Sequence, residues 1–245
     1  MRNLKLIIEY DGTAYHGWQW QPNGITIQQV LEEIIATITQ AHSKLISSGR
    51  TDAGVHALNQ VAHFRTASRI SLYNLRRAMN SMLPHDIVVK EISEVDDDFH
   101  ARYSVKSKVY MYRIYNNPVR TALWRNRAWH IYDELDLEAM KTALKLIEGT
   151  HDFSSFCGAN DDAKTHVRRI ISTDICIEAP RMIIITIEAN GFLRYMVRNI
   201  VGTLADVGRG RIVPADFFEL LQYRDRTKAG VTAPPQGLFL KEVRY

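Results

Sequence analysis

Hydrophobic and polar residues alternate with two different periods along the chain, and these periods separate strands from helices. In the first half, Leu4, Leu6 and Ile8 repeat every second residue, as in a strand with a buried face. Thr26 with Gln29 forms a capping box, after which apolar residues follow helical spacing to about residue 40. The pattern predicts, in order, a strand, a helix, two strands, a helix and a strand, over residues 4–10, 27–40, 45–46, 61–65, 72–82 and 87–92.

The second half repeats this order loosely. A long strand is expected over 105–116, and Asp136 can cap a helix that ends before Gly149. Two paired strands flank a turn at 179–181, and a strongly periodic helix follows them over 192–207. The remaining expected elements are a strand at 129–132, a short helix after Pro214 and a last strand at 238–243.

This order predicts an α+β protein with two ferredoxin-like (split βαβ) halves, residues 1–104 and 105–245. The halves are expected to form a mainly antiparallel extended sheet. Helices would cover one face, and the open face would be a cleft for RNA. No residue-level repeat is visible, so the predicted symmetry is one of topology.

Composition is typical of a soluble globular protein, with 46% hydrophobic and 24% charged residues. No apolar run approaches the ~20 residues that span a bilayer, and the chain begins directly with a strand pattern. Two cysteines, Cys157 and Cys176, are too few for a disulfide framework and are expected to be reduced thiols. A cytoplasmic protein with no membrane association is the expectation.

The charge balance is weakly basic and rich in arginine. The net charge is +4, and 21 of the 31 basic residues are Arg. Arginine makes forked contacts to phosphate and stacks on bases, which favours a nucleic-acid partner. A net charge this small also serves solubility, so composition alone leaves the two interpretations nearly even.

A glycine-rich segment at 47–57 carries the candidate chemistry. Gly49 and Gly54 suit a sharply bent loop, in which Asp52 can project from the scaffold and Arg50 can contact a planar anionic ligand. In isolation, such an Asp more often only stabilises a turn.

The string GRTDAGVHA at 49–57 resembles the catalytic loop of the TruA-type tRNA pseudouridine synthases. Further stretches resemble the same family and are spread over the whole chain, at 10–13, 83–87, 99–102, 108–110, 149–156, 191–193, 196–198 and 234–238. The resemblance implies a cofactor-free homodimeric enzyme that converts uridine to pseudouridine at positions 38, 39 and 40 in the anticodon stem-loop of tRNA.

The resemblance also implies roles for four residues. Asp52 is the expected nucleophile, acting either by attack on C1′ or by forming a glycal, and the resemblance leaves both routes open. Tyr110 is expected to stack on the target base, Arg50 to take the place of the extruded base, and Arg198 to pair with Asp52.

His56 and His63 lack zinc-type spacing and are expected to be hydrogen-bonded histidines, so no metal is predicted. The arginines at 209 and 211 follow a helix and are expected to touch RNA backbone. An RNA-binding protein of the same fold that has lost catalysis is the main alternative, and a purely structural α/β protein would leave the arginine excess unexplained.

Overall fold

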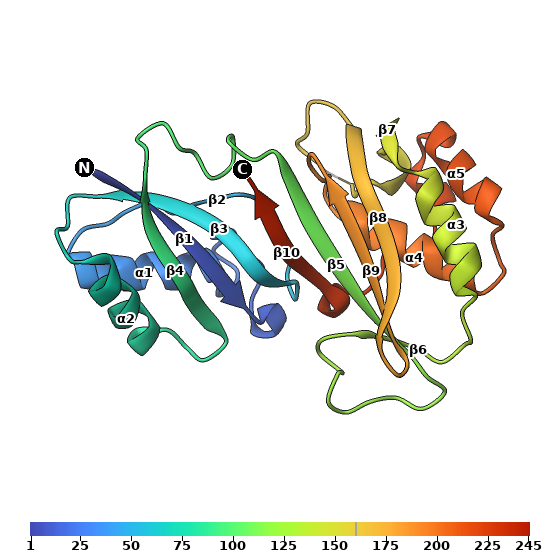
Figure 1. Ribbon diagram of the computed structural model, residues 1–245, viewed down its shortest axis with the longest axis horizontal. Helices are drawn as coiled ribbons and strands as arrows, with labels where there is room; N and C mark the ends of the chain where they lie inside the picture. Colours follow the sequence, from blue (N-terminus) through green and yellow to red (C-terminus); the bar gives the residue numbers. More distant parts are fainter. Residues whose placement is uncertain (160) are drawn as a thin grey trace. The chain divides into compact units, whose positions relative to one another are not determined.

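The computed structural model describes residues 1–159 and 161–245. The chain forms two compact units (Figure 1). The first contains Met1–Lys106 together with Phe239–Tyr245, and the second contains Ser107–Leu238.

The first unit is a sheet built around β3 (His56–Thr66), which runs antiparallel to β1 (Arg2–Tyr10). The strand order is β4 (Ile87–Val95), β1, β3 and β10 (Leu238–Arg244), with β10 parallel to β3. The short strand β2 (Ile46–Ser47) pairs with the same edge of β3 as β10 does. It pairs near the C-terminal end of β3, whereas β10 pairs with the N-terminal end. Two helices, α1 (Ile27–Thr39) and α2 (Leu72–Met82), complete this unit with the 3₁₀ turn η1 (Gly12–Ala14).

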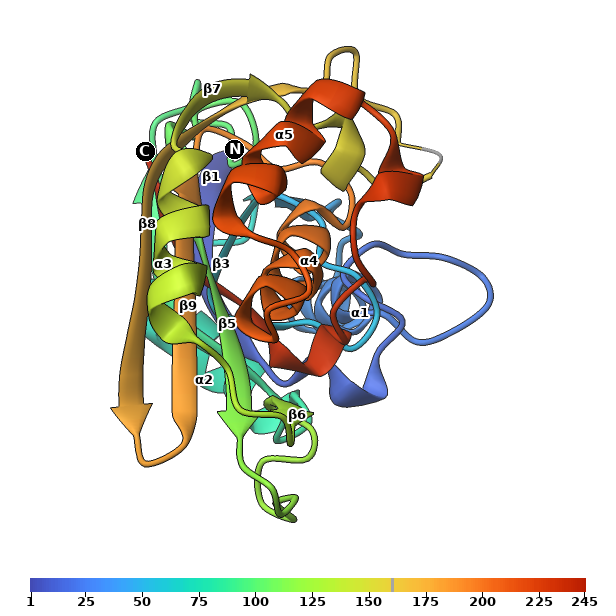
Figure 2. The ribbon, with the colours of Figure 1, turned by 90° about the vertical axis from the view of Figure 1, so that its right-hand side faces the viewer.

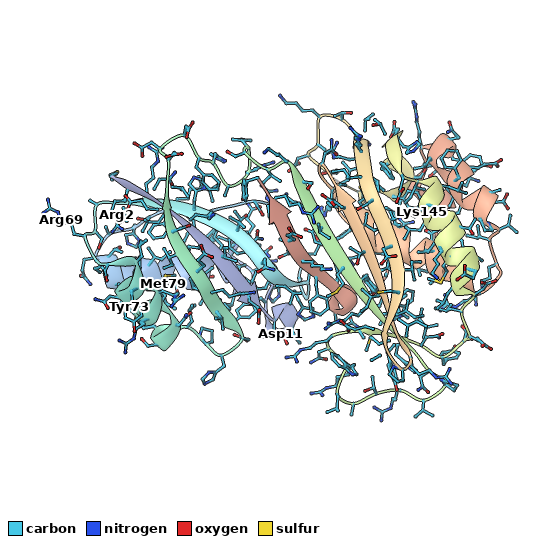
Figure 3. The ribbon with its side chains drawn as sticks, viewed as in Figure 1. Arg2, Asp11, Arg69, Tyr73, Met79 and Lys145 are labelled. Atoms are coloured by element: carbon cyan, nitrogen blue, oxygen red, sulfur yellow. The ribbon has the colours of Figure 1, made fainter. Side chains whose placement is uncertain are left out.

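Side-chain caps and alternating burial explain these elements. Thr26 accepts a hydrogen bond from the Gln29 backbone N–H, and Ser71 accepts one from Asn74, as expected at helix N-termini. Buried residues of β1 and of the two helices form the core of this unit: α1 contacts α2, α2 contacts β4, and α2 contributes the buried Met79 (Figure 3). The fully buried members of this core include Leu4, Leu6, Ile8, Ile27, Leu31 and Ile35.

The second unit has the strand order β5 (Ser107–Asn116), β9 (Met182–Ala189), β8 (Val167–Ala179) and β7 (Gly149–Asp152), all antiparallel. A short strand, β6 (Trp129–Ile131), runs parallel to β5. Its helices α3 (Leu137–Leu146), α4 (Met196–Gly208) and α5 (Pro214–Tyr223) pack against one another, and α3 contacts β8 (Figure 2). Three further 3₁₀ turns are η2 (Ser154–Phe156), η3 (Arg226–Lys228) and η4 (Pro235–Gly237).

The mixed α+β character and the mainly antiparallel strands are confirmed. Two local expectations need correction. The helix expected from residue 192 begins at Met196, because Tyr195 has φ +61° and cannot continue a right-handed helix. The strand β7 was not expected.

The last strand also lies with a different part of the chain than its sequence position indicates. The sequence pattern predicts it in the half beginning at residue 105, whereas residues Phe239–Tyr245 cluster with the first unit. The register that pairs Phe239 with His56 and Leu240 with Ala57 is the physical reason. No helix in the described ranges is long and apolar enough to cross a membrane.

Candidate active site

The loop that carries Asp52 connects β2 to β3 and is held at Thr51. The Thr51 hydroxyl and the buried Tyr10 hydroxyl share a 2.7 Å hydrogen bond, and the Trp18 backbone N–H donates to the Thr51 carbonyl at 3.0 Å. Burial raises the pKa of Tyr10 well above its ordinary value, so its hydroxyl stays protonated and able to donate. The residue before Asp52 is thereby tied to the end of β1.

A tight turn follows Asp52. The Val55 N–H donates to the Asp52 carbonyl at 3.1 Å, and Gly54 within the turn has φ +76°. This confirms the expected use of Gly54. Gly49 has no positive φ, and its carbonyl instead accepts hydrogen bonds from the Ser47 hydroxyl and the Gln60 amide.

Two glycines from the segment after β1 let the backbone approach this loop closely. A Cβ placed on Gly12 would lie 2.0 Å from the Val55 carbonyl oxygen, and one on Gly17 would lie 2.6 Å from the Thr51 carbonyl oxygen. Gly17 also has φ +85°. No other residue type fits these positions without moving the loop on either side of Asp52.

The end of the loop is fixed by His56. Its Nδ1 accepts a 3.0 Å hydrogen bond from the Gly12 N–H and lies 3.1 Å from a carboxylate oxygen of Asp11, which lies at the end of β1 (Figure 3). Its ring stacks on Phe239 with centroids 4.6 Å apart. His63 likewise accepts from the Ala101 N–H at 3.1 Å. The prediction that both histidines are hydrogen-bonded is confirmed.

Within this loop Asp52 is half-buried and Arg50 is exposed. A carboxylate on a braced turn is held with little freedom, which suits a group that must attack or deprotonate a bound sugar. Arg50 lies two residues away on the same loop, where solvent can reach it.

Tyr110 and Arg198 belong to the second unit. Tyr110 lies on β5 opposite Ile187, is 8% exposed, and meets the edge of Phe192 with ring centroids 4.9 Å apart. The loop therefore brings together Arg50 and Asp52, and the second unit separately holds Tyr110 and Arg198.

Arg198 is held in the first turn of α4. Its Nε donates to the Ala233 carbonyl at 2.8 Å, and the Ala233 N–H donates back to the Arg198 carbonyl at 3.0 Å. The guanidinium lies 4.9 Å from the ring centroid of Tyr195, a cation–π distance. Sequence reasoning missed Tyr195, which lies inside the helix expected over 192–207 and offered no signal of the left-handed backbone.

The close contact between α4 and residues 231–233 depends on Gly202. A Cβ there would lie 1.7 Å from the Val231 carbonyl oxygen. Beside it the buried Asn199 carboxamide oxygen accepts hydrogen bonds from Arg226 and from the Thr232 hydroxyl. Together these contacts fix the position of the Ala233 carbonyl, which accepts the hydrogen bond from Arg198.

Arg209, one of the two arginines expected to touch RNA, makes ion pairs within the second unit. Its guanidinium pairs with Asp133 at 2.9 Å and Asp206 at 3.3 Å, and its side chain is 15% exposed. Arg211 also pairs with Asp206, yet is 65% exposed. Of these two arginines, Arg211 is the one that an RNA phosphate could reach.

Comparison with known proteins identifies the class. The family described as tRNA pseudouridine synthase matches residues 6–104 and 143–245. Proteins named tRNA pseudouridine synthase A from Thermoanaerobacter sp. (strain X514), Caldicellulosiruptor bescii and Acetivibrio thermocellus are 48%, 49% and 50% identical to this chain, each over 100% of both sequences. The chain belongs to the tRNA pseudouridine synthase family.

Among solved structures, a chain of the archaeal box H/ACA sRNP Nop10–Cbf5 complex has a TM-score of 0.37 at 11% identity, over 82% of this chain and 44% of that one. A similarity this distant does not establish a shared fold.

Substituting Gly202→Ala tests the close contact between α4 and residues 231–233, next to the Ala233 carbonyl that binds Arg198. Alanine favours a helix over glycine by about 1 kcal/mol, but the clash with a backbone carbonyl outweighs this gain. We expect a loss of about 1–3 kcal/mol in the free energy of unfolding, measured by urea denaturation. The matched control is Gly191→Ala, whose Cβ would make ordinary contact at 3.5 Å with the Arg168 side chain. Equal stability of the two variants would contradict the proposed contact.

Proposed function

We propose that this protein isomerises uridine to pseudouridine at positions 38, 39 and 40 of the tRNA anticodon stem-loop, with Asp52 as nucleophile and without a cofactor. The observation that carries the proposal is that hydrogen bonds hold the loop on both sides of Asp52. Asp52 lies between Thr51, bound to Tyr10 and Trp18, and the turn closed by Val55. That loop has the sequence GRTDAGVHA, in a chain that belongs to this family.

The reaction conserves all atoms of the nucleotide. The bond between uracil N1 and ribose C1′ breaks, the base turns, and a new bond forms between C5 and C1′. The C5 proton is then lost to a base, and N1 takes up a proton. Asp52 can serve this sequence either by bonding to C1′ or by removing a ribose proton to give a glycal. Both routes need its carboxylate ionised.

The other three residues would handle the base and its charge. A target uridine must leave the helical stack before the carboxylate can reach its sugar. Arg50, exposed on the loop, is proposed to occupy the vacated position. Tyr110 is proposed to stack on the base, supported by its edge contact with Phe192. Arg198 is proposed as the cation that keeps Asp52 ionised.

Exposed arginines and an aromatic ring in the first unit suit an RNA backbone. Arg69 and the 61%-exposed Tyr73 lie at the surface beside the start of α2 (Figure 3), and the Arg77 guanidinium lies 5.6 Å from the Tyr73 ring centroid. Such pairs contact phosphates and bases without sequence preference.

The finer architecture is also a proposal. We infer that the two halves are ferredoxin-like, which in the first unit is supported by antiparallel β1–β3, β1–β4 and β2–β3 pairs. The enzyme is proposed to act in the cytoplasm.

A homodimer is expected because the anticodon stem-loop lies far from the body of tRNA. One subunit could bind the body of the tRNA while the other modifies its anticodon stem-loop. Light scattering at working concentration should give about twice the 28.1 kDa chain mass. A monomer that modifies tRNA at full rate would exclude an obligatory dimer.

The decisive variant is Asp52→Asn, which keeps size and hydrogen bonding but removes the negative charge. We expect no detectable pseudouridine in undermodified tRNA, with tRNA affinity little changed. The matched control is Asp98→Asn on an exposed loop, which should keep wild-type turnover. Turnover within about tenfold of wild type for Asp52→Asn would exclude Asp52 as the essential group. A wild-type chain that binds tRNA without modifying it would instead support the non-catalytic alternative.

Tyr110→Phe separates stacking from proton transfer. Phenylalanine keeps the ring, so stacking worth ~1–3 kcal/mol should survive and tRNA binding should hold. If the hydroxyl accepts the C5 proton, single-turnover rates should fall by ~10²–10⁴-fold, with exposed Tyr223→Phe as control. A rate within about threefold of wild type, far short of that range, would leave Tyr110 as a stacking surface only.

A further inference from the structure

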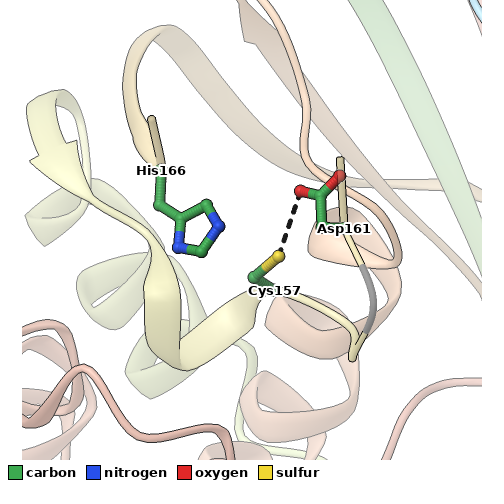
Figure 4. A group of neighbouring side chains, drawn as sticks. All are labelled: Cys157, Asp161 and His166. Atoms are coloured by element: carbon green, nitrogen blue, oxygen red, sulfur yellow. Dashed lines mark hydrogen bonds between the residues drawn. The ribbon is translucent and has the colours of Figure 1, made fainter. Parts of the chain in front are cut away.

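A cluster of three metal-type ligands lies in the second unit, between η2 and β8 (Figure 4). Cys157, Asp161 and His166 each turn one ligand atom toward the others, and these atoms all lie within 4.8 Å of one another. The Cys157 sulfur donates to an Asp161 carboxylate oxygen at 3.1 Å. Among the residues that the structure describes, no other group of His, Cys, Asp and Glu meets this condition.

The hydrogen bonds around His166 define which ring nitrogen is available. The Ser154 hydroxyl donates its single proton to Asp152 at 2.6 Å. It can therefore only accept from His166 Nδ1, which lies 2.9 Å away. Nδ1 therefore carries a proton, and in the neutral imidazole Nε2 holds the lone pair. The Ser154 hydroxyl, held by the Asp152 carboxylate, thus orients the imidazole as an oxygen acceptor behind a metal-bound histidine does.

We propose that Cys157, Asp161 and His166 bind one divalent zinc-type cation through Sγ, a carboxylate oxygen and Nε2. Thiolate, imidazole and carboxylate are the ligand types that zinc takes in proteins. Ligand atoms around a tetrahedral zinc ion lie about 3.5 Å apart, so the three side chains need to close by only about 1 Å. Three protein ligands leave a fourth position for water. The proposal is independent of the uridine chemistry and contradicts the expectation that the chain holds no metal.

The same three residues could instead form a nucleophilic cysteine with its base. Burial and the neighbouring Asp161 raise the pKa of the Cys157 thiol to about 12. Reactive cysteines have lowered pKa values, so the metal-free site disfavours a nucleophile, whereas a bound cation would itself displace the thiol proton. When the cation binds, the thiol proton leaves to solvent, and the two negative ligands balance the 2+ charge.

A bound cation would stiffen the segment that precedes α4. The Gly158 N–H donates to the Arg194 carbonyl at 2.8 Å, and the Arg194 guanidinium donates to the Ala159 carbonyl at 3.3 Å. Arg194 also lies 5.0 Å from the ring centroid of Tyr195, the residue that contacts Arg198. The expected role of the metal is to hold Gly158 and Ala159 in contact with Arg194.

The test uses the full chain, stripped with a chelator under a thiol-free reductant and titrated with Co²⁺ and then Zn²⁺. We expect one equivalent of Co²⁺ to give a sulfur-to-cobalt charge-transfer band that Zn²⁺ abolishes. Cys157→Ser should remove the band. Cys176→Ser, which changes the exposed cysteine, should keep it. Ser154→Ala leaves the three ligands in place and should weaken binding by ~10–100-fold through the freed imidazole.

Circular dichroism of the metal-free variants checks that each one folds. If Cys157→Ser unfolds, the half-buried His166→Gln and Asp161→Asn provide the same comparison. No charge-transfer band in the wild type, a band that persists in the folded ligand variants, or a band lost in Cys176→Ser would overturn the proposal.

Discussion

The approach of one backbone to another at Gly12 and Gly17 is the constraint on which the Asp52 loop depends. Both residues come within a distance of loop carbonyls that no side chain allows. This contact lets the Trp18 N–H and the Tyr10 hydroxyl both reach Thr51, the residue before Asp52. A reacting carboxylate misplaced by 1 Å can cost about 10²-fold in rate, so the role proposed for Asp52 depends on this packing as well as on the charge of its carboxylate.

In the second unit, a close approach of two backbone segments at a glycine likewise positions Arg198. Gly202 admits the Val231 carbonyl against α4, and Ala233 then exchanges two hydrogen bonds with Arg198. Tyr195 holds a left-handed backbone just before the helix, a conformation that costs about 1–3 kcal/mol. Cation–π contacts with Arg194 and Arg198 compensate for part of that cost. Such strain at a helix start next to an arginine is typical of a functional site.

Local signals in the sequence predicted most helices and strands, because caps and periodicity act over a few residues. Thr26, Ser71 and Asp136 all cap the helices expected of them. The start of α4 was not predictable, since Leu193 and Met196 keep helical spacing across the left-handed Tyr195. The partner of β10 was equally hidden. Its pairing with His56 and Ala57 joins residues more than 180 positions apart, and no local pattern encodes such a contact.

The candidate site likewise has a part that local sequence signals predict and a part that depends on contacts between distant residues. Matching motifs are the source of the four proposed site residues, because motifs identify groups that can react: Asp52, Tyr110, Arg50 and Arg198. The groups that hold them, such as Tyr10 and Gly17, look in the sequence like an ordinary strand residue and a loop glycine. Cys157, Asp161 and His166 show the limit most clearly, because their spacing matches no zinc motif and the buried cysteine alone indicates only packing. The proposed role of His166 depends on the Ser154 hydroxyl, which donates to Asp152 and therefore accepts from His166 Nδ1. Only the folded geometry determines the direction of these two hydrogen bonds.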